Sequence, residues 1–353
     1  MLPFREVFYA KKIEPSKICF LVGDIGGTNS NFGIVEPHND TFTLLLSLHF
    51  KSSEIKNFPD LIADIISYLN DKYSLTITKA CLGAAGIISE LRDWAKPTNL
   101  HFEIDAKKIK EKTGLATVVL INDFEAVGFG IEKLAKKDLV HLNNGAPRAY
   151  ANKAILGAGT GLGKGIMAWD EPRHTYIPVP SEGGHADFAV QSQQELDFIN
   201  FIKTSEHIPC NISWENILSG RGIQRIYSFL GSVGSYQSTQ YTQEIEKNGL
   251  HPDMIFGYRM HDERCKDTFE LFAGWYGRCA KNFTLDVLAL GGMYIAGGIA
   301  SKNLDLFKVP HFMGEFVNCG KQMQRLKDVP VYVISDYNVS LYGAAQYLML
   351  RHI

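Results

Sequence analysis

The chain has 353 residues, of which 45% are hydrophobic and 21% charged, a composition typical of folded proteins rather than of disordered or fibrous ones. Its 36 lysine and arginine residues nearly balance 38 aspartate and glutamate residues, for a formal net charge of -2. This balance argues against a nucleic-acid-binding protein, because such proteins carry a basic excess that neutralises phosphates. The length favours two domains, at about 100–200 residues per domain.

The cysteines and the apolar stretches indicate the compartment. The six cysteines are scattered, with no CxxC pair and no Cys/His cluster at zinc spacing, so we expect neither a disulfide framework nor a structural metal. The segment Met1–Pro15 is charged and lacks the apolar centre of a secretory signal. The stretch Val287–Ala300 is shorter than the ~20 residues that cross a membrane, and four glycines interrupt it. We therefore predict a cytoplasmic protein that does not enter a membrane.

The first half of the chain predicts an α/β layer. Ile18–Gly23 reads as an apolar strand, Asp24–Asn29 as a tight glycine turn, and Asn31–Val35 as an antiparallel return strand. The elements expected after them are strands over Phe42–Phe50, Ala80–Ile88 and Ala116–Ile121, and helices over Asp60–Leu69, Ile104–Lys112 and Phe124–Lys136. Alternating strands and helices in this order favour the α/β class.

The second half opens in the same way as the first. Ala154–Leu156 is apolar, Gly157–Gly163 is a glycine turn, and Gly165–Trp169 returns as a strand, although identity between the halves is too low to define a repeat. Gly231–Tyr241 is rich in serine, glutamine and glycine and predicts a mobile surface loop. The remaining expected elements are helices over Ser192–Lys203, Trp214–Leu230, Asp267–Leu290 and Ser340–Leu350, and strands over Met293–Ile299 and Val329–Ile334.

The glycine clusters do not fit the two commonest nucleotide-binding motifs. Glycines let backbone N–H groups approach phosphates closely, but glycine-rich turns alone are weak signals. A dinucleotide fingerprint that begins at Gly157 would need glycine where Leu162 stands, and a P-loop that includes Lys164 would need serine or threonine at Gly165. Another kind of phosphate site is therefore expected.

Five motifs follow one another over most of the chain: Asp24–Asn29, Ile121–Phe124, Leu156–Gly163, Ser181–Phe188 and Ile295–Ile299. On these motifs the sequence, from about Ile18 to its end, resembles the bacterial-type glucokinases, which share a superfamily with hexokinase, actin and the heat-shock chaperones. The resemblance implies a two-domain hexokinase/actin-like (ribonuclease H-like) α/β fold with a ligand cleft between the domains. It also implies a small domain at 1–133 plus 338–353 and a large domain at 134–337.

The resemblance also implies a catalytic residue and a set of sugar ligands. Asp123, taken alone, reads as a helix N-cap, but the matching family residue is the base that accepts the proton of the sugar 6-hydroxyl. Taken alone, the other candidates read as an ordinary turn, a core histidine and helix residues. By resemblance the sugar is bound by Asn99, Asn122, Asp123, Glu182, His185 and Glu215. Carboxylates accept hydroxyl hydrogens and histidine can donate, which suits a polyol.

A third set of residues resembles the ATP site of the family. Asp24 is a common residue in turns, but by resemblance it helps to place Mg²⁺ and the phosphates, usually through water. The matching phosphate-loop and adenosine-turn residues are Gly26, Gly27, Thr28, Asn29, Gly159, Thr160, Gly161, Gly297 and Gly298. Because Mg²⁺ can be held chiefly by nucleotide oxygens and water, no carboxylate cage is required. The expected cofactors are ATP and Mg²⁺, and we predict no metal site made of protein ligands alone.

The sequence as a whole predicts a glycolytic enzyme, a glucokinase that converts D-glucose into glucose 6-phosphate with ATP. By resemblance we expect a homodimer, with no nucleic-acid or membrane partner. Two departures stand out: the segment Gly83–Ile88 lacks a proline common in the family, and the cysteine/histidine zinc motif of ROK kinases is absent. The alternatives are a kinase for another hexose, a non-catalytic sugar- or nucleotide-binding regulator of the same fold and, more remotely, an actin-like filament protein.

Overall fold

A computed structural model describes residues 2–39, 41–97 and 100–350. The chain divides into two compact units, and three stretches of sequence form the first: Met1–Ala135, Tyr176–Pro180 and Asn338–Ile353. The second unit consists of Lys136–Thr175 and Ser181–Tyr337. A six-stranded sheet forms the centre of each unit.

The sheet of the first unit is mixed. Its strands lie in the order β1 (Arg5–Phe8), β4 (Phe42–Lys51), β3 (Asn29–Pro37), β2 (Ile18–Ile25), β5 (Thr76–Ala84) and β9 (Thr117–Asn122). The first four pair antiparallel, whereas β2, β5 and β9 run parallel. The carboxyl ends of the three parallel strands therefore lie at one edge of the sheet.

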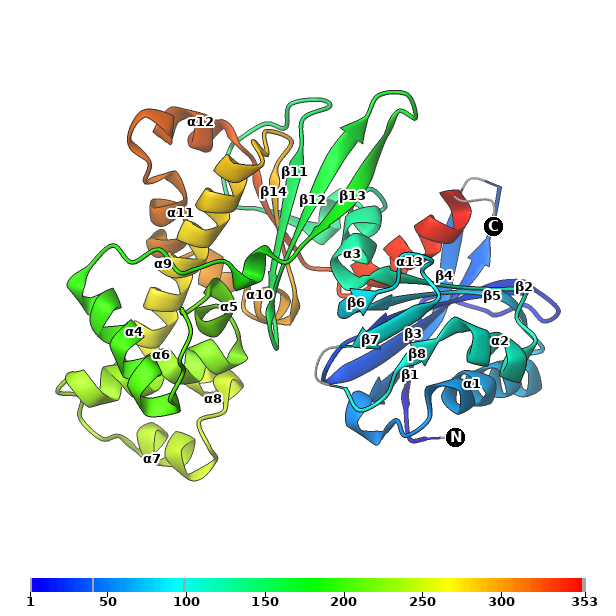
Figure 1. The fold of residues 1–353 in the computed structure, drawn as a ribbon, viewed down its shortest axis with the longest axis horizontal. Helices are drawn as coiled ribbons and strands as arrows, with labels where there is room; N and C mark the ends of the chain where they lie inside the picture. Colours follow the sequence, from blue (N-terminus) through cyan, green and yellow to red (C-terminus); the bar gives the residue numbers. More distant parts are fainter. Residues whose placement is uncertain (1, 40, 98–99, 351–353) are drawn as a thin grey trace. The chain divides into compact units, whose positions relative to one another are not determined.

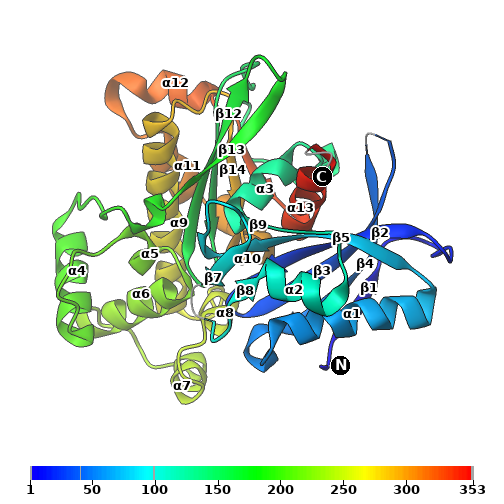
Figure 2. The same ribbon diagram turned by 45° about the vertical axis from the view of Figure 1, so that its right-hand side comes forward.

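Helices cover both faces of this sheet. The helices α1 (Phe58–Tyr73) and α2 (Ala106–Thr113) pack on one face, and α3 (Asp123–Ile131) and α13 (Val339–Leu350) pack on the other (Figures 1 and 2). The α3–α13 contact is close, since a Cβ atom on Gly343 would lie 1.6 Å from the carbonyl oxygen of Ala126. Three short strands, β6 (Gly86–Ile88), β7 (Trp94–Pro97) and β8 (Ile104–Asp105), form a small separate sheet.

The sheet of the second unit contains a second glycine hairpin. Its strands lie in the order β10 (Leu139–His141), β15 (Val331–Ile334), β14 (Met293–Ala296), β11 (Lys153–Ala158), β12 (Leu162–Asp170) and β13 (Thr175–Ser181). The edge strand β13 is hydrogen-bonded in this sheet, although its central residues, Tyr176–Pro180, are grouped with the first unit. The strands β11 and β12 form the hairpin, and β11, β14 and β15 run parallel. The ends of β11 and β14 consequently lie next to each other.

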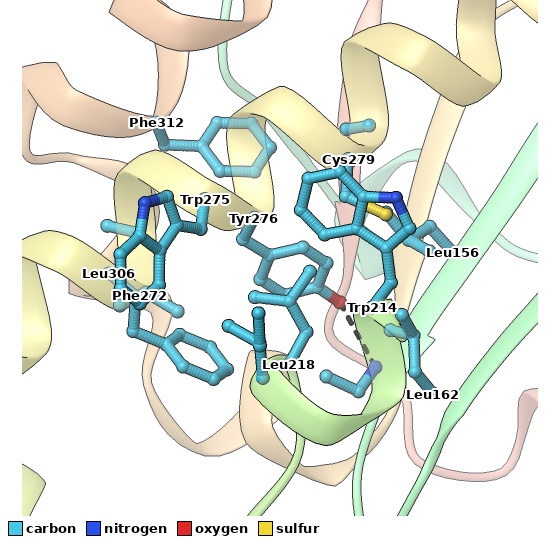
Figure 3. Packing of buried hydrophobic residues seen from close by; sticks show 14 of the residues in the cluster. Leu156, Leu162, Trp214, Leu218, Phe272, Trp275, Tyr276, Cys279, Leu306 and Phe312 are labelled. Carbon is cyan, nitrogen blue, oxygen red and sulfur yellow. Dashed lines mark hydrogen bonds between the residues drawn. The ribbon is translucent and has the colours of Figure 1, made fainter. Parts of the chain in front are cut away.

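Helices make up most of the rest of the second unit. They are α4 (Gln193–Glu206), α5 (Trp214–Ile217), α6 (Gly220–Val233), α7 (Gln240–Lys247), α8 (Pro252–Gly257), α9 (Glu263–Asp286), α10 (Gly298–Lys302), α11 (Pro310–Val317) and α12 (Met323–Asp328). Short 3₁₀ turns occupy Ser52–Glu54 in the first unit and, in the second unit, Lys136–Asp138, Gly183–His185, Leu304–Phe307 and Gly320–Gln322. Figure 3 shows the aromatic core around Tyr276 of α9, which is fully buried. Across the described ranges, no helix has the length and apolar character that a membrane span requires.

Most predicted elements are confirmed, including both glycine hairpins, but one predicted helix is wrong. The segment Trp214–Leu230 is divided between α5 and α6 rather than forming a single helix. The division occurs because the hydroxyl of Ser219 caps α6 by accepting the N–H of Gly222, at 3.2 Å. The N–H of Gly220 donates instead to the carbonyl of Gly159, at 2.9 Å, so a long-range bond replaces a helical one.

Other boundaries also differ from the sequence prediction. The helix expected at Phe124–Lys136 ends at Ile131, and Ile104–Asp105 is a strand rather than the start of a helix, because the Asp105 side chain caps α2. Part of Gly231–Tyr241 is helical, at the end of α6 and the start of α7. The strands β1 and β13 and the helices α7, α8, α11 and α12 lie where no element was predicted.

The contact between α9 and α11 gives a stability test. A Cβ atom on Gly277 of α9 would lie 2.1 Å from the carbonyl oxygen of Phe312 in α11, whereas a Cβ atom on Gly314 would meet no atom within 4 Å. We expect Gly277→Ala to destabilise the protein by about 1–3 kcal/mol through overpacking. Gly314→Ala is the control and should stabilise α11 by roughly 0.5–1 kcal/mol. Thermal unfolding measures both, and equal melting temperatures would contradict the packing described here.

Candidate active site

The edge where the parallel strands of the first unit end carries two predicted site residues. The register pairs Asp24 of β2 with Gly83 of β5, and Gly83 with Ile121 of β9, directly before Asn122 and Asp123. A Cβ atom on Gly83 would lie only 3.9 Å from the Cα atom of Asp123. The start of α3 therefore packs on β5. Asp24 lies at the end of β2 and Asp123 directly follows β9, and these two strands are separated by one strand, about 10 Å in a regular sheet.

The residue that caps α3 is Asn122, so the interpretation of Asp123 as the N-cap is wrong. The Asn122 Oδ1 atom accepts the N–H groups of Phe124 (2.9 Å) and Glu125 (3.3 Å), and the Glu125 carboxylate accepts the N–H of Asn122 (3.4 Å). Asp123 is the first residue of the helix, and its Oδ1 atom also accepts the N–H of Phe124, at 3.0 Å. The cap is thus made without Asp123, whose carboxylate lies beside helix N–H groups that favour its charged form.

An ion pair between the partly exposed Arg92 and the buried Glu125 fixes the start of α3. Both nitrogens at the end of the Arg92 side chain donate to Glu125, at 2.7 and 2.9 Å, and Glu125 is only 5% exposed. Arg92 has a left-handed backbone (φ 57°), and its carbonyl accepts the N–H of Leu120, at 2.9 Å. Sequence reasoning missed this pair. The spacing of Asn122 and Glu125 is a readable capping-box signal, but nothing in the sequence connects Arg92 with them.

The first glycine turn is a rigid loop. The N–H of Gly26 donates to the carbonyl of Asn29, at 3.0 Å. Ser52, which follows β4, stabilises the loop with two hydrogen bonds: its hydroxyl donates to the carbonyl of Gly26 (2.7 Å), and its N–H donates to the carbonyl of Thr28 (3.0 Å). Gly27 is partly exposed and Thr28 is exposed, so a phosphate can reach the loop from solvent.

Asp24 is the residue of this region that fits Mg²⁺. Its side chain is desolvated, which raises the pKa of the carboxyl group, while hydrogen bonds with Ser340 and Asn31 oppose the shift. A desolvated carboxylate is stabilised by a nearby cation, and Mg²⁺ prefers oxygen donors together with water. Within the described part of the chain, no group of three or more histidine, cysteine, aspartate or glutamate side chains could hold a metal ion. Asp24 could therefore contribute to a site that nucleotide oxygens and water complete.

In the second unit, the predicted second phosphate loop contacts a predicted sugar ligand. The loop at Gly159–Gly161 closes through a hydrogen bond from the N–H of Gly159 to the carbonyl of Gly161, at 2.8 Å. Glu215 Oε2 accepts the N–H of Leu162, at 3.0 Å, and would lie 2.4 Å from a Cβ atom on Gly161. Only glycine at position 161 leaves room for this carboxylate, which connects the loop to α5.

The structure brings three of the predicted sugar ligands together. His185 Nε2 lies 3.8 Å from a carboxylate oxygen of Glu182, and Nδ1 lies 3.9 Å from one of Glu215. The side chains of Glu182 and His185 are largely exposed, whereas that of Glu215 is 34% exposed because the buried Trp214 anchors its helix. The cluster offers carboxylate acceptors and imidazole nitrogens to a ligand with several hydroxyls. The remaining predicted ligand, Asn99, lies outside the described residues.

The predicted adenosine turn lies beside the same phosphate loop. Gly297 adopts φ 91° and is the N-cap residue directly before α10, and a Cβ atom on it would lie 2.6 Å from the carbonyl oxygen of Ala158. The N–H of Ala158 donates to the buried hydroxyl of Tyr276, at 3.1 Å (Figure 3). Gly297 and Gly298 are thus next to Gly159–Gly161 at the paired ends of β11 and β14.

The predicted residues therefore form two groups, each within one unit. The first unit holds the group Asp24, Gly26, Gly27, Thr28, Asn29, Asn122 and Asp123. The second unit holds the group Gly159, Thr160, Gly161, Glu182, His185, Glu215, Gly297 and Gly298.

Comparisons with known proteins show that the chain belongs to the glucokinase family. A family model described as Glucokinase matches residues 21–351. The glucokinase of Nostoc punctiforme is 35% identical over 338 residues, which cover 92% of this chain and 97% of the relative. A crystal structure of glucokinase from an Antarctic psychrotroph has a TM-score of 0.74 at 25% identity and covers 94% of this chain and 98% of that one.

A further solved structure bears on the fold. The ROK family glucokinase from Streptomyces griseus, solved in complex with glucose and AMPPNP, has a TM-score of 0.64 at 18% identity. It covers 93% of this chain and 98% of that one. Together with the family match, these likenesses confirm the predicted two-domain hexokinase/actin-like fold class.

The hydrogen bond between Tyr276 and Ala158 gives a second stability test. We expect Tyr276→Phe to cost about 1–3 kcal/mol, because it leaves a buried backbone N–H without its partner. The control is Tyr332→Phe on β15, another buried tyrosine, whose hydroxyl makes no hydrogen bond with the residues that the structure describes. Chemical denaturation measures both variants. Equal losses would show that the Tyr276 hydroxyl does not support the phosphate loop.

Proposed function

Because this chain belongs to the glucokinase family, it is a glucokinase, and we propose that it transfers the γ-phosphoryl group of ATP to the 6-hydroxyl of D-glucose with Asp123 as general base. The observation that carries the assignment of Asp123 is that other residues make the N-terminal cap of α3. Asn122 and Glu125 make the cap, so the carboxylate of Asp123 is not needed to begin the helix. It can instead accept the proton of the attacking hydroxyl.

The orientation of this base is supported by its surroundings. The Phe124 N–H donates to Oδ1 of Asp123, which fixes the carboxylate at the start of α3, where we assign it as the acceptor for the sugar proton. The ion pair of Arg92 and Glu125 holds the first turn of α3 in place behind it. Because a general base must lie within hydrogen-bond reach of its proton, a fixed helix start favours the reaction.

Glucose recognition is assigned mainly to the cluster in the second unit. Carboxylate oxygens of Glu182 and Glu215 each lie within 4 Å of a ring nitrogen of His185, so the three side chains can bind several hydroxyls of one sugar. Asn122 adds a donor, since its Oδ1 atom is used by the cap and its Nδ2 atom makes no hydrogen bond with the described residues. We also assign Asn99 to this set, on the family resemblance alone.

ATP binding is assigned to the two glycine loops and the turn at Gly297 and Gly298. The backbone N–H groups of glycine loops suit phosphate oxygens, and the absence of a side chain at Gly297 lets a nucleoside lie against the backbone. The contact between Glu215 and the loop at Gly161 couples the sugar set to the phosphate set within the second unit.

Mg²⁺ accompanies ATP in this proposal, with Asp24 as the residue that would hold it. When bound, the ion neutralises charge on the phosphates that are being transferred. The glycolytic role and the homodimer are proposed on the family resemblance, and the cytoplasmic location on the scattered cysteines of the sequence.

The role of Asp123 is tested by Asp123→Asn. The amide oxygen still accepts the N–H of Phe124, so we expect an intact fold, but an amide cannot take the sugar proton. We expect kcat to fall by roughly 10²–10⁴, with the KM values for glucose and ATP nearly unchanged. A coupled assay for glucose 6-phosphate measures these constants. Glu111→Gln, at an exposed site on α2, is the control, and a kcat near the wild-type value in Asp123→Asn would remove Asp123 from the mechanism.

The choice of sugar is tested by comparing glucose, mannose, fructose and N-acetylglucosamine. We expect kcat/KM to be highest for glucose, by about tenfold or more, because a misplaced hydroxyl leaves polar groups of the site unpaired. Initial rates with Mg²⁺–ATP measure the preference. A higher value for another hexose would reassign the substrate. Folded protein that binds ATP but turns over no sugar would favour the regulator alternative.

A further inference from the structure

A row of polar side chains crosses the sheet of the first unit and ends at Asp24. The strand register pairs Asp24 of β2 with Asn31 of β3, Asn31 with His49 of β4, and His49 with Arg5 of β1. Because directly paired residues point to the same face of a sheet, these four side chains lie side by side. The face is the one that α3 and α13 cover.

Hydrogen bonds connect this row to the carboxylate of Asp24. His49 Nδ1 lies 2.7 Å from Oδ1 of Asn31. An amide oxygen can only accept, so Nδ1 carries the proton and donates it. The amide nitrogen of Asn31 is then directed to Asp24, with which Asn31 shares a side-chain hydrogen bond. Asn31 is only 5% exposed, which limits the other orientations open to its side chain.

The second ring nitrogen of His49, Nε2, also has a hydrogen-bond partner. His49 Nε2 lies 2.7 Å from the hydroxyl of the buried Ser47, which lies 3.1 Å from the hydroxyl of Tyr9. Since Nδ1 carries the proton of a neutral ring, Nε2 accepts from Ser47. Burial and the charge of Arg5 lower the pKa of His49, in agreement with the neutral ring that these contacts require.

The network returns to Asp24 through the start of α13. The hydroxyl of Tyr9 donates to Oδ1 of Asn338, at 3.0 Å, and Ser340, two residues further on, shares a side-chain hydrogen bond with Asp24. Asp24 is therefore held from two directions, by Asn31 from the sheet and by Ser340 from the helix. Tyr9 gives its one proton to Asn338 and Ser47 gives its own to His49, so the 3.1 Å approach of the Tyr9 and Ser47 hydroxyls is a packing contact between the two routes.

Tyr9 lies in a segment outside the match to the family model, which begins at residue 21. The strand β1 pairs with β4, and the N–H of Tyr9 continues the pairing by donating to the carbonyl of Leu45, at 2.9 Å. The N-terminal segment thus adds an edge strand to the sheet and contributes a hydroxyl to the network around Asp24.

We propose that Asn31 and His49 are positioning residues that hold the carboxylate of Asp24 for Mg²⁺–ATP, and that Tyr9 of the N-terminal segment stabilises their arrangement. The inference rests on the proposed role of Asp24. Residues that orient a metal-binding carboxylate by hydrogen bonding commonly change metal affinity or activity 10–100-fold when they are replaced. A carboxylate that is already oriented needs no rearrangement when Mg²⁺–ATP binds.

The test compares His49→Phe and Asn31→Leu with the wild type. We expect the Mg²⁺ concentration for half-maximal activity to rise about tenfold or more, with the KM for glucose changed by less than about twofold. Calorimetric titration with AMPPNP, with and without Mg²⁺, gives a readout besides turnover, and both variants should lose most of the Mg²⁺-dependent gain in affinity. His49→Asn keeps an N–H donor near the position of Nδ1 and should restore part of the gain.

Matched controls separate this role from a general effect on the fold. His38→Phe removes an exposed histidine that lies 3.0 Å from Thr43 in the same unit, and it should leave the Mg²⁺ dependence unchanged. Tyr9→Phe should raise the Mg²⁺ requirement more than Tyr68→Phe does, since the Tyr68 hydroxyl anchors the N-terminal segment to α1 through Glu6 instead. Circular dichroism and thermal unfolding check that each variant is folded. If His49→Phe does not fold, His49→Asn and Asn31→Leu carry the test.

Asp24→Asn distinguishes the failure of this inference from that of the proposed role of Asp24. If Asp24→Asn leaves the Mg²⁺ dependence unchanged, Asp24 does not place the ion and both ideas are overturned. If Asp24→Asn raises the requirement but folded His49→Phe and Asn31→Leu do not, only the positioning inference is overturned. In the double variant Asp24→Asn/His49→Phe, we expect the effect of His49→Phe to vanish, because the histidine acts through the aspartate. An undiminished effect would also overturn the inference.

Discussion

The parallel pairing of β2, β5 and β9 is the constraint on which the proposed catalytic site of the first unit depends. Parallel strands bring their carboxyl ends to one edge, so a turn that follows β2 and a helix that follows β9 meet there. Glycine at position 83 lets the helix start approach the middle strand. The consequence is that Asp24 and Asp123, nearly a hundred residues apart in the chain, serve one edge of one sheet.

In the second unit, too, parallel strands bring the predicted site residues to neighbouring strand ends. Its glycine hairpin ends beside the turn at Gly297, because β11 and β14 are parallel neighbours. The side chain of Glu215 fixes the loop Gly159–Gly161, because its carboxylate accepts the N–H of Leu162 at the end of that loop. Tyr276, in the aromatic core, also holds the start of the loop, because its hydroxyl accepts the N–H of Ala158. Apolar packing and the placement of the polar site are thus coupled through a few hydrogen bonds.

In the first unit, the carboxylates of Asp24 and Asp123 are both hydrogen-bonded by neighbouring groups. Asp24 has Asn31 and Ser340, and Asp123 has the N–H of Phe124 together with a cap made by other residues. A carboxylate that is fixed before the substrate arrives loses little conformational entropy during the reaction. This arrangement explains why so much buried polar structure lies next to one edge of a sheet.

The sequence by itself determined the local features and the family. The glycine hairpins, the αL glycine that ends α2 at Gly114, and the five ordered motifs follow from residues close together in the chain, because turn geometry and capping act over a few residues. The sequence also contained the capping-box spacing of Asn122 and Glu125, although Asp123, taken alone, also fits a helix N-cap. These signals were enough to predict the fold class and the reaction.

Only the tertiary structure decided which distant residues support the site. The break after α5 arises because the N–H of Gly220 bonds to Gly159, and no local pattern indicates a partner so far along the chain. The pairing of Arg92 with Glu125 and the contact of His49 with Asn31 likewise depend on strand register and helix docking. Register is set by the burial of whole faces of a sheet, a property of the assembled layers rather than of any short segment.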